Sequence, residues 1–232
     1  MGKNLKQQRR GKGNTRYLAP SHRYIGKIRY LELGEREGVV IDIVHSTGKH
    51  TPVAVAEFNG KHELMIPASG TAVGQKIRYG TELTNGNVVP INSVPEGTRI
   101  FNIELRPGDG GKMCRAPGCF ATMSVRGDNQ CVIELPSRRQ VSINANCRAT
   151  IGIPAGYGRQ EKPFMKAGNK YFAMKAKGTL YPIVRGAAQN AVDHPFGGKT
   201  SPGKEKTVSR SAPPGRKVGM IAAKRTGKRR GR

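Results

Sequence analysis

The sequence predicts a mainly β protein built from two small antiparallel barrels, with a long basic extension at each end. Short runs rich in β-branched residues recur between residues 39 and 143, and turn signals close many of them. Convincing helical periodicity is absent over the same region. Evenly spaced short strands joined by turns are typical of small barrels. Most of the excess charge lies outside this region, at the two ends of the chain.

Seven strands are expected, and Gly, Asn or Pro closes several of them, as at Asn59-Gly60. In chain order the predicted strands cover residues 39–44, 51–58, 63–66, 98–105, 120–125, 131–135 and 140–143. A stretch bounded by prolines, residues 90–95, is predicted to separate the two barrels. The 232 residues leave room for two small domains once the charged ends are set aside.

The two ends of the chain are cationic arms. Residues 1–29 carry nine Lys/Arg and no Asp or Glu, and residues 201–232 carry eleven Lys/Arg against Glu205 alone. These 61 residues hold +19 of the formal charge of +26. A segment of this composition cannot bury enough apolar surface to offset its ordering entropy, so we expect each arm to be disordered alone and to fold against a polyanion.

Nucleic acid, an anionic membrane surface and an acidic protein are the candidate polyanions. A segment that lies on a membrane needs apolar residues along one helix face, and Gly11, Gly13 and Gly215 interrupt any such period. Nucleic acid is therefore the favoured partner. No run of about 18 apolar residues occurs, and no apolar core follows the charges at the N-terminus, so neither membrane insertion nor export is expected.

Residues 157–177 combine aromatic residues and methionines with lysines. The apolar members are Phe164, Met165, Tyr171, Phe172 and Met174, and the lysines are Lys162, Lys166, Lys170, Lys175 and Lys177. Two interpretations stay open: the rings stack on bases or sugars, or the apolar side chains pack on a barrel and only the lysines face the partner. Both interpretations put this segment in the binding surface.

The four cysteines, Cys114, Cys119, Cys131 and Cys147, are interpreted as reduced thiols because the chain has no export signal. Four thiolates could hold zinc, but structural zinc sites use two short Cys-x2-4-Cys pairs, and only Cys114 and Cys119 approach that spacing. A zinc site is therefore not expected.

The most specific local sequence is Val184-Arg-Gly-Ala-Ala-Gln-Asn-Ala-Val-Asp-His-Pro-Phe-Gly-Gly198. It resembles the signature of the L-two family of large-subunit ribosomal proteins. Phe196 stands where bacterial members of that family typically have a second histidine, which indicates the archaeal and eukaryotic branch. Further blocks similar to the family are Gln8–Gly11, Ala19–Arg23, Pro95–Thr98, Arg106–Gly111, Cys147–Gly152, Glu161–Phe164 and Lys166–Gly168.

The resemblance implies an OB-type β-barrel followed by an SH3-like barrel. It divides the chain into a basic N-terminal extension (1–33), the OB-like barrel (34–90), the SH3-like barrel (91–160) and a basic C-terminal extension with the signature (161–232). The implied function is that of a structural, non-enzymatic constituent of the large ribosomal subunit in the cytoplasm. Its extensions would enter 23S-type rRNA near the peptidyl transferase region and support subunit association, tRNA binding and peptide-bond formation.

Asp193 and His194 raise an enzymatic alternative, since a histidine beside a carboxylate can act as a general base. Pro195 biases His194 toward an extended backbone, in which neighbouring side chains point apart, and no G-x-S-x-G motif occurs. The stretch Gly197–Ser201 lacks the preceding glycine of a phosphate-binding loop. A His194-centred enzyme and a free-standing nucleic-acid-binding regulator remain as alternatives.

The predicted rRNA-binding residues combine bases of the arms with residues of the signature. They are Arg9, Arg10, Lys12, Arg16, His22, Arg23, Lys162, Lys166, Lys170, Lys175, Lys177, Arg185, Asn190, His194, Gly197, Gly198, Lys199, Arg210, Arg216 and Lys217, with Asp193 and His194 as the functionally sensitive pair. The expected partners are rRNA, neighbouring ribosomal proteins, the small-subunit bridge and nearby tRNA, without a membrane or a second copy of the chain. No cofactor is expected beyond Mg²⁺ that accompanies rRNA.

Overall fold

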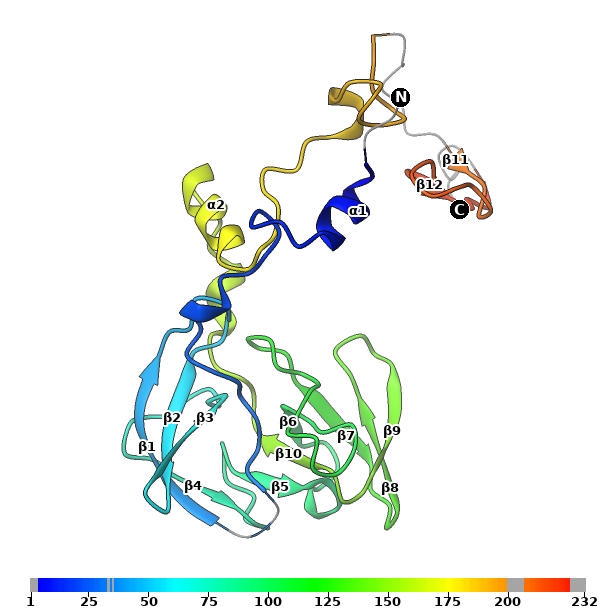
Figure 1. Cartoon of the computed structure of the whole chain (residues 1–232). Coiled ribbons are helices and arrows are strands. Elements are labelled where there is room, and N and C mark those ends of the chain that lie inside the picture. The colour runs from blue at the N-terminus through cyan, green and yellow to red at the C-terminus, as the bar shows by residue number, and fades with distance from the viewer. Residues whose placement is uncertain (1–3, 33, 35, 200–206, 226–232) are drawn as a thin grey trace. The chain divides into compact units, whose positions relative to one another are not determined.

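The computed structural model describes residues 4–32, 34, 36–199 and 207–225 (Figure 1). The chain divides into two compact units. One, the barrel unit, is Pro20–Lys166, and the other, the arm unit, combines Met1–Ala19 with Ala167–Arg232. Glu205 and the basic residues 226–232 of the predicted C-terminal arm lie outside the described residues.

The barrel unit is one continuous ten-stranded sheet in the order β3-β2-β1-β4-β5-β10-β6-β7-β8-β9. The strands are β1 Arg36–Val44, β2 Val53–Phe58, β3 Lys61–Met65, β4 Lys76–Tyr79, β5 Val88–Pro90, β6 Arg99–Phe101, β7 Ala121–Val125, β8 Gln130–Glu134, β9 Gln140–Asn144 and β10 Arg148–Ile151. Short 3-10 turns cover Ser21–Arg23, Ile91–Ser93 and Tyr157–Gln160. The predicted mainly β class is confirmed.

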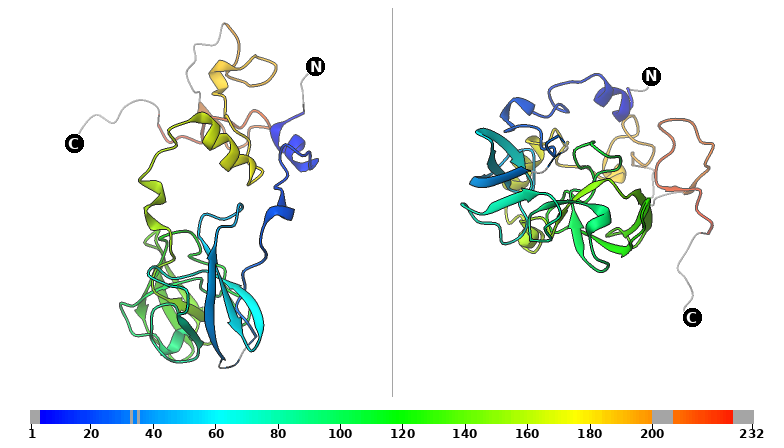
Figure 2. Two further views of the ribbon diagram at one scale, coloured as in Figure 1. Left: turned by 90° about the vertical axis from the view of Figure 1, so that its left-hand side faces the viewer. Right: turned by 90° about the horizontal axis from the view of Figure 1, so that it is seen from below.

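The barrel unit has two large apolar cores and a smaller apolar cluster of Ile28, Val53, Ile66, Ala68 and Phe101. The first is formed by Tyr30 and side chains of β1–β5: Val40, Ala54, Ala56, Phe58, Met65, Ile77, Tyr79 and Val88. The second is formed between residues 89 and 151, around Ile100, Ile103, Met123, Ile133 and Ile143. Seen from below, β1–β3 gather on one side and the green strands β7–β9 on the other (Figure 2).

A single strand, β5, serves both cores. It pairs in parallel with β4 and antiparallel with β10. Because successive side chains of a strand point to opposite faces, Val88 enters the first core and Val89 the second. The predicted boundaries after residues 33, 90 and 160 stay predictions.

All seven predicted strands are present, with shifted ends. The largest difference is at β6, which ends at Phe101 rather than residue 105, because Asn102 adopts φ +50° and leaves the extended conformation. The sequence reasoning missed β4, β5 and β10. Strand β10 is buried at all four positions, since Ala149 and Ile151 enter the second core while Arg148 and Thr150 bond to Glu104 and Tyr30, and it therefore shows no alternation.

The described residues of the arm unit form two α-helices, α1 (Lys6–Gly11) and α2 (Ala167–Lys175), which were not predicted. A 3-10 turn covers Gly186–Ala188, and β11 (Thr207–Val208) pairs in parallel with β12 (Met220–Ile221). Helix α2 has good helix formers such as Ala, Lys and Met but no buried residue, so it lacks the apolar stripe that marks a helix in a sequence. Among the described residues, no helix is long and apolar enough to cross a membrane.

Candidate nucleic-acid interface

The arm unit concentrates the charge of the chain. It contains 22 Lys/Arg and two acidic residues, Asp193 and Glu205, a formal charge of +20, whereas the barrel unit has 19 basic and 13 acidic residues, a charge of +6. In the barrel unit, carboxylates form ion pairs with Lys and Arg side chains, as Glu37 does with Lys76 and Arg78. Two acidic residues cannot balance 22 bases, so the arm unit needs counter-charge from outside the chain.

Most predicted binding residues are exposed. In the arm unit these are Arg9, Arg10, Lys12, Arg16, Lys175, Arg185, Asn190, Gly198, Lys199, Arg210, Arg216 and Lys217, and in the barrel unit His22, Arg23, Lys162 and Lys166. Lys170, Lys177, His194 and Gly197 are half-buried. The structure thus brings sixteen of the twenty predicted residues into one unit, assembled from both ends of the sequence.

The aromatic and methionine side chains on and before α2 are largely exposed. Met165 is 85% exposed and Phe172 is 68% exposed. The Tyr171 and Phe172 rings meet edge to face, with centroids 5.4 Å apart. The Lys170 ammonium lies 5.3 Å from the centre of the Tyr181 ring, at cation–π distance. This segment therefore presents ring faces and lysines together.

Residues 184–198, which we call the signature loop, are closed by their own hydrogen bonds. The amides of Asp193 and His194 both donate to the Asn190 carbonyl, at 2.9 and 3.1 Å. The Gly198 amide donates to the Gln189 carbonyl at 3.2 Å, which joins the two ends of the turn. These bonds hold the loop in a closed turn of its own.

His194 has a defined orientation inside the signature loop. Its Nδ1 accepts a hydrogen bond from the Phe196 amide at 3.1 Å, and its ring centroid lies 5.1 Å from that of Phe196. Gly186 permits this position, since a Cβ there would lie 2.4 Å from the His194 ring. With Nδ1 accepting, the proton of the neutral ring is on Nε2, which makes Nε2 a donor rather than a base.

The cysteines lie in or beside the second core. Cys131 and Cys147 are fully buried, and Cys114 and Cys119 are half-buried. Burial raises the pKa of the Cys147 thiol to about 11, and burial with the nearby Cys119 does the same for Cys114. Within the part of the chain that the structure describes, no group of three or more His, Cys, Asp or Glu could hold a metal ion. The expectation of no zinc stays a prediction.

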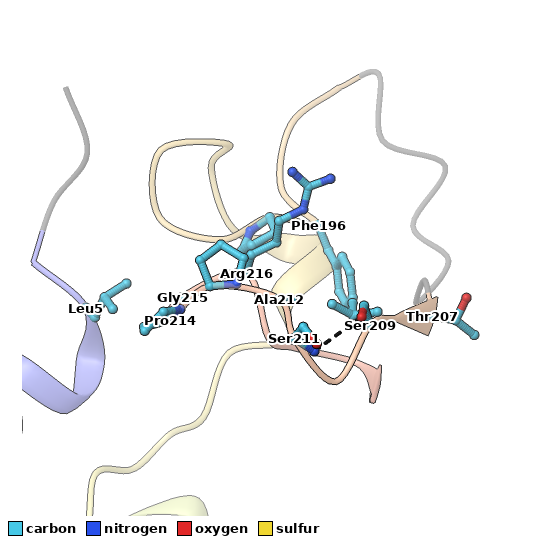
Figure 3. A pocket seen from close by; sticks show the side chains of 12 residues that line it. Leu5, Phe196, Thr207, Ser209, Ser211, Ala212, Pro214, Gly215 and Arg216 are labelled. Atoms are coloured by element: carbon cyan, nitrogen blue, oxygen red, sulfur yellow. Dashed lines mark hydrogen bonds between the residues drawn. The ribbon is translucent and has the colours of Figure 1, made fainter. Parts of the chain in front are cut away.

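Contacts between the two arms escaped the sequence reasoning. Figure 3 shows a pocket in the arm unit, to which the N-terminal arm contributes Leu5. The other lining residues come from the C-terminal part of the chain: Pro195, Phe196, Thr207, Val208, Ser209, Ser211, Ala212, Pro213, Pro214, Gly215 and Arg216. Phe196 is only 8% exposed. In the sequence, the hint of this contact was Leu5, an apolar residue that stands among the basic residues of the N-terminal arm.

Comparisons with known proteins identify the family. The family model described as Ribosomal Proteins L2, C-terminal domain, matches residues 84–217. The chain is 48% identical to the large ribosomal subunit protein uL2 of Methanothermobacter thermautotrophicus, across 99% of this chain and 100% of that protein. It is 47% identical to the uL2 proteins of Methanopyrus kandleri and Haloarcula marismortui, across 98% of each chain.

These matches confirm the predicted family and its OB-type and SH3-like architecture, and the three relatives are archaeal. The signature loop lies inside the matched family region. The chain belongs to the uL2 family of large ribosomal subunit proteins.

Proposed function

We propose that this chain is a structural constituent of the large ribosomal subunit that binds 23S-type rRNA. The ribosomal role follows from its family, whose members compared above are named large ribosomal subunit proteins along their full length. The chain is a cytoplasmic ribosomal protein and not an enzyme. It acts by shape recognition and charge neutralisation.

The observation that carries rRNA binding is the arm unit, with its charge of +20 and its exposed Arg and Lys side chains. A protein that places such side chains on phosphates releases the counterions condensed on the nucleic acid. This release supplies affinity without sequence readout. The arms therefore bind by charge, and the barrel unit supplies a docking face of its own. Mg²⁺ held by rRNA is compatible with this mode of binding.

Helix α2 and the residues before it can contribute stacking contacts to RNA binding, in addition to positive charge. Exposed Phe164, Met165 and Phe172 offer apolar faces to unpaired bases or sugars, while Lys166 and Lys175 meet phosphates. Stacking of a base on an aromatic ring is worth about 1 to 3 kcal/mol. Phe164 and Met165 belong to the barrel unit and are exposed there, which supports the stacking interpretation for these two residues.

The signature loop is proposed to contact rRNA near the peptidyl transferase region, beside tRNA and the small-subunit bridge. The amides of Gly197 and Gly198 donate to the His194 and Gln189 carbonyls and so hold the turn closed, whereas the His194 Nε2–H is a donor for a phosphate or a 2′-hydroxyl. The loop supports subunit association, tRNA binding and peptide-bond formation through shape. Neighbouring ribosomal proteins complete its surroundings.

A sucrose gradient tests the ribosomal role. The full chain carries an affinity tag and is expressed in an archaeal host, and the lysate is sedimented at low magnesium to separate the subunits. We expect the tagged chain in the large-subunit fractions. If it stays at the top of the gradient while still binding nucleic acid, the chain is a free-standing regulator and the proposal is wrong.

A further inference from the structure

The N-terminal arm touches the basic C-terminal extension (residues 161–232), called the C-terminal arm from here on, at the end of helix α2. The amides of Gly178 and Thr179 donate to the carbonyls of Lys175 and Met174 at 3.1 and 3.0 Å, which closes the helix. Gly178 adopts φ +64°, and a Cβ on it would lie 2.7 Å from the Ala19 nitrogen and 2.8 Å from the Tyr17 carbonyl oxygen. The backbone of the N-terminal arm therefore passes directly against this turn, as Figure 1 also shows.

A second contact joins the arms near their outer ends. The side chain of Leu5 lies against Gly215, where a Cβ would come within 2.5 Å of Leu5 Cδ2. Gly215 lies in the turn that the amide of Arg216 closes by donating to the carbonyl of Pro213 at 3.1 Å. Leu5 thus faces the pocket beside Phe196 and Arg216 (Figure 3). The two contacts are independent and use opposite ends of the N-terminal arm.

These contacts join segments of the chain that carry like charges. Arg16 immediately precedes the touching residues of the N-terminal arm, and Lys175 and Lys177 flank the turn on the other side. Arg9 and Arg10 follow Leu5 in α1, while Arg216 follows Gly215. Coulomb repulsion opposes each of these arrangements in water, and a polyanion that meets both sides removes the repulsion. RNA bound to one arm therefore favours the arrangement in which the other arm also contacts the RNA.

From these contacts we infer that the N-terminal and C-terminal arms bind RNA as one coupled unit, seated on each other at Gly178 and at Leu5, and not as two independent tails. The inference rests on the proposed function, since rRNA is the polyanion. Because each arm restricts the other, the coupled arms lose less conformational entropy on binding RNA than two independent tails would lose. It also determines which Lys and Arg side chains of the two arms face the same stretch of RNA phosphates.

A double-mutant cycle on the full chain tests this coupling, with an in vitro transcript of Methanothermobacter thermautotrophicus 23S rRNA as the probe. Arg9→Gln, Arg10→Gln and Lys12→Gln together neutralise three of the nine positive charges of the N-terminal arm, and Gly178→Ala breaks the inter-arm contact. We expect neutralisation to weaken binding about tenfold in the parent chain and less than about threefold in the Gly178→Ala background. The same factor in both backgrounds overturns the coupling.

Two further variants separate coupling from local damage. Gly97→Ala, in the barrel unit, imposes similar strain at φ +79° with no atom within 4 Å, and should keep the full tenfold effect. Leu5→Ala removes the other contact without strain or change of charge, and should reduce the effect as Gly178→Ala does; an undiminished effect contradicts the coupling. Failure of the parent chain to bind the transcript would instead refute the proposed function.

Discussion

The carboxylate of Glu104 and the guanidinium of Arg148 form a two-point ion pair inside the barrel unit. Arg148 Nη2 lies 2.9 Å from Glu104 Oε1, and Nε lies 3.3 Å from Oε2. Glu104 is fully buried and Arg148 is 7% exposed. The Gly110 amide also donates to Glu104, at 3.0 Å, and Arg148 Nη1 donates to the Leu31 carbonyl at 2.7 Å. The pair therefore ties the segment before β1 to β10 and to the loop after β6.

Glu104→Gln should destabilise the barrel unit by about 3 kcal/mol or more, because it leaves the buried guanidinium of Arg148 without its counter-charge. The matched control is Glu82→Gln, since Glu82 pairs with Arg78 at the surface, and it should cost less than about 1 kcal/mol. Urea unfolding of both full-length variants measures the difference. Equal losses would show that the buried pair does not stabilise the fold.

The barrel unit should lose stability in alkali. Burial raises the pKa of Tyr79 to about 12 and also raises that of Tyr30, whereas a tyrosine of an unfolded chain titrates near 10. Their contribution is therefore complete below about pH 10 and is lost as pH rises toward 12. At pH 10.5 the expected loss is about 1 kcal/mol for each tyrosine.

Urea unfolding of the parent and of Tyr79→Phe at pH 8 and pH 10.5 checks this assignment. The variant should lose less stability between the two pH values than the parent does, because one of the groups with a raised pKa is gone, while Tyr30 and the buried thiols still titrate in both proteins. An identical loss in both proteins would rule out Tyr79 as a source of the pH dependence.

The buried thiols should be unreactive in the native protein. Cys131 and Cys147 are fully buried, and burial keeps the Cys147 thiol protonated at pH 8. Ellman's reagent should therefore modify these two cysteines only after guanidinium is added, while half-buried Cys119 reacts first. Metal analysis of the same sample should find no stoichiometric zinc. Fast native modification of Cys147, or one zinc per chain, would contradict the description of the second core.

His194→Ala should leave assembly of the large subunit largely intact and weaken its function. The change removes the acceptor of the Phe196 amide and the Nε2–H donor. The loss of one hydrogen bond of about 1 kcal/mol corresponds to about a fivefold lower rate. Translation by purified ribosomes that carry the variant measures the effect.

His194→Asn is the informative comparison, because its side-chain oxygen can take over the role of Nδ1 as acceptor. If His194 acts only by shaping the signature loop, this variant restores activity; if its Nε2–H contacts rRNA, the variant stays impaired. We expect it to stay impaired. Ribosomes with His194→Ala that translate at the wild-type rate would end the functional assignment of this residue.

Strands with one face in a core were predictable from the sequence, because burial on one side produces alternation. Strand β8 is such a case, with Cys131 and Ile133 buried between exposed Gln130 and Glu134. Strand β10 was not predictable, because both of its faces are buried and its side chains show no alternation between apolar and exposed polar residues. Its register depends on pairing with residues about 60 positions earlier in the chain, at β5.

The candidate interface also has a part that was predictable from the sequence and a part that was not. Its bases were predictable from charge alone, because exposure is the default for Arg and Lys in segments without apolar residues. The contacts of Gly178 with residues 17–19 and of Leu5 with Gly215 join positions about 160 and 210 apart in sequence. Such contacts leave no periodic pattern, so only the structure reveals them.

The salt dependence of rRNA binding tests the central claim most directly. Affinity of the full chain for a 23S rRNA transcript is measured from 50 to 400 mM KCl, beside a full-length variant with the bases of residues 4–19 and 207–225 changed to Gln. The logarithm of the affinity should fall against the logarithm of salt with a slope steeper than about −5, and the variant should bind more weakly with a shallower slope. Affinity that does not change with salt, or that survives in the variant undiminished, would contradict binding by the charged arms.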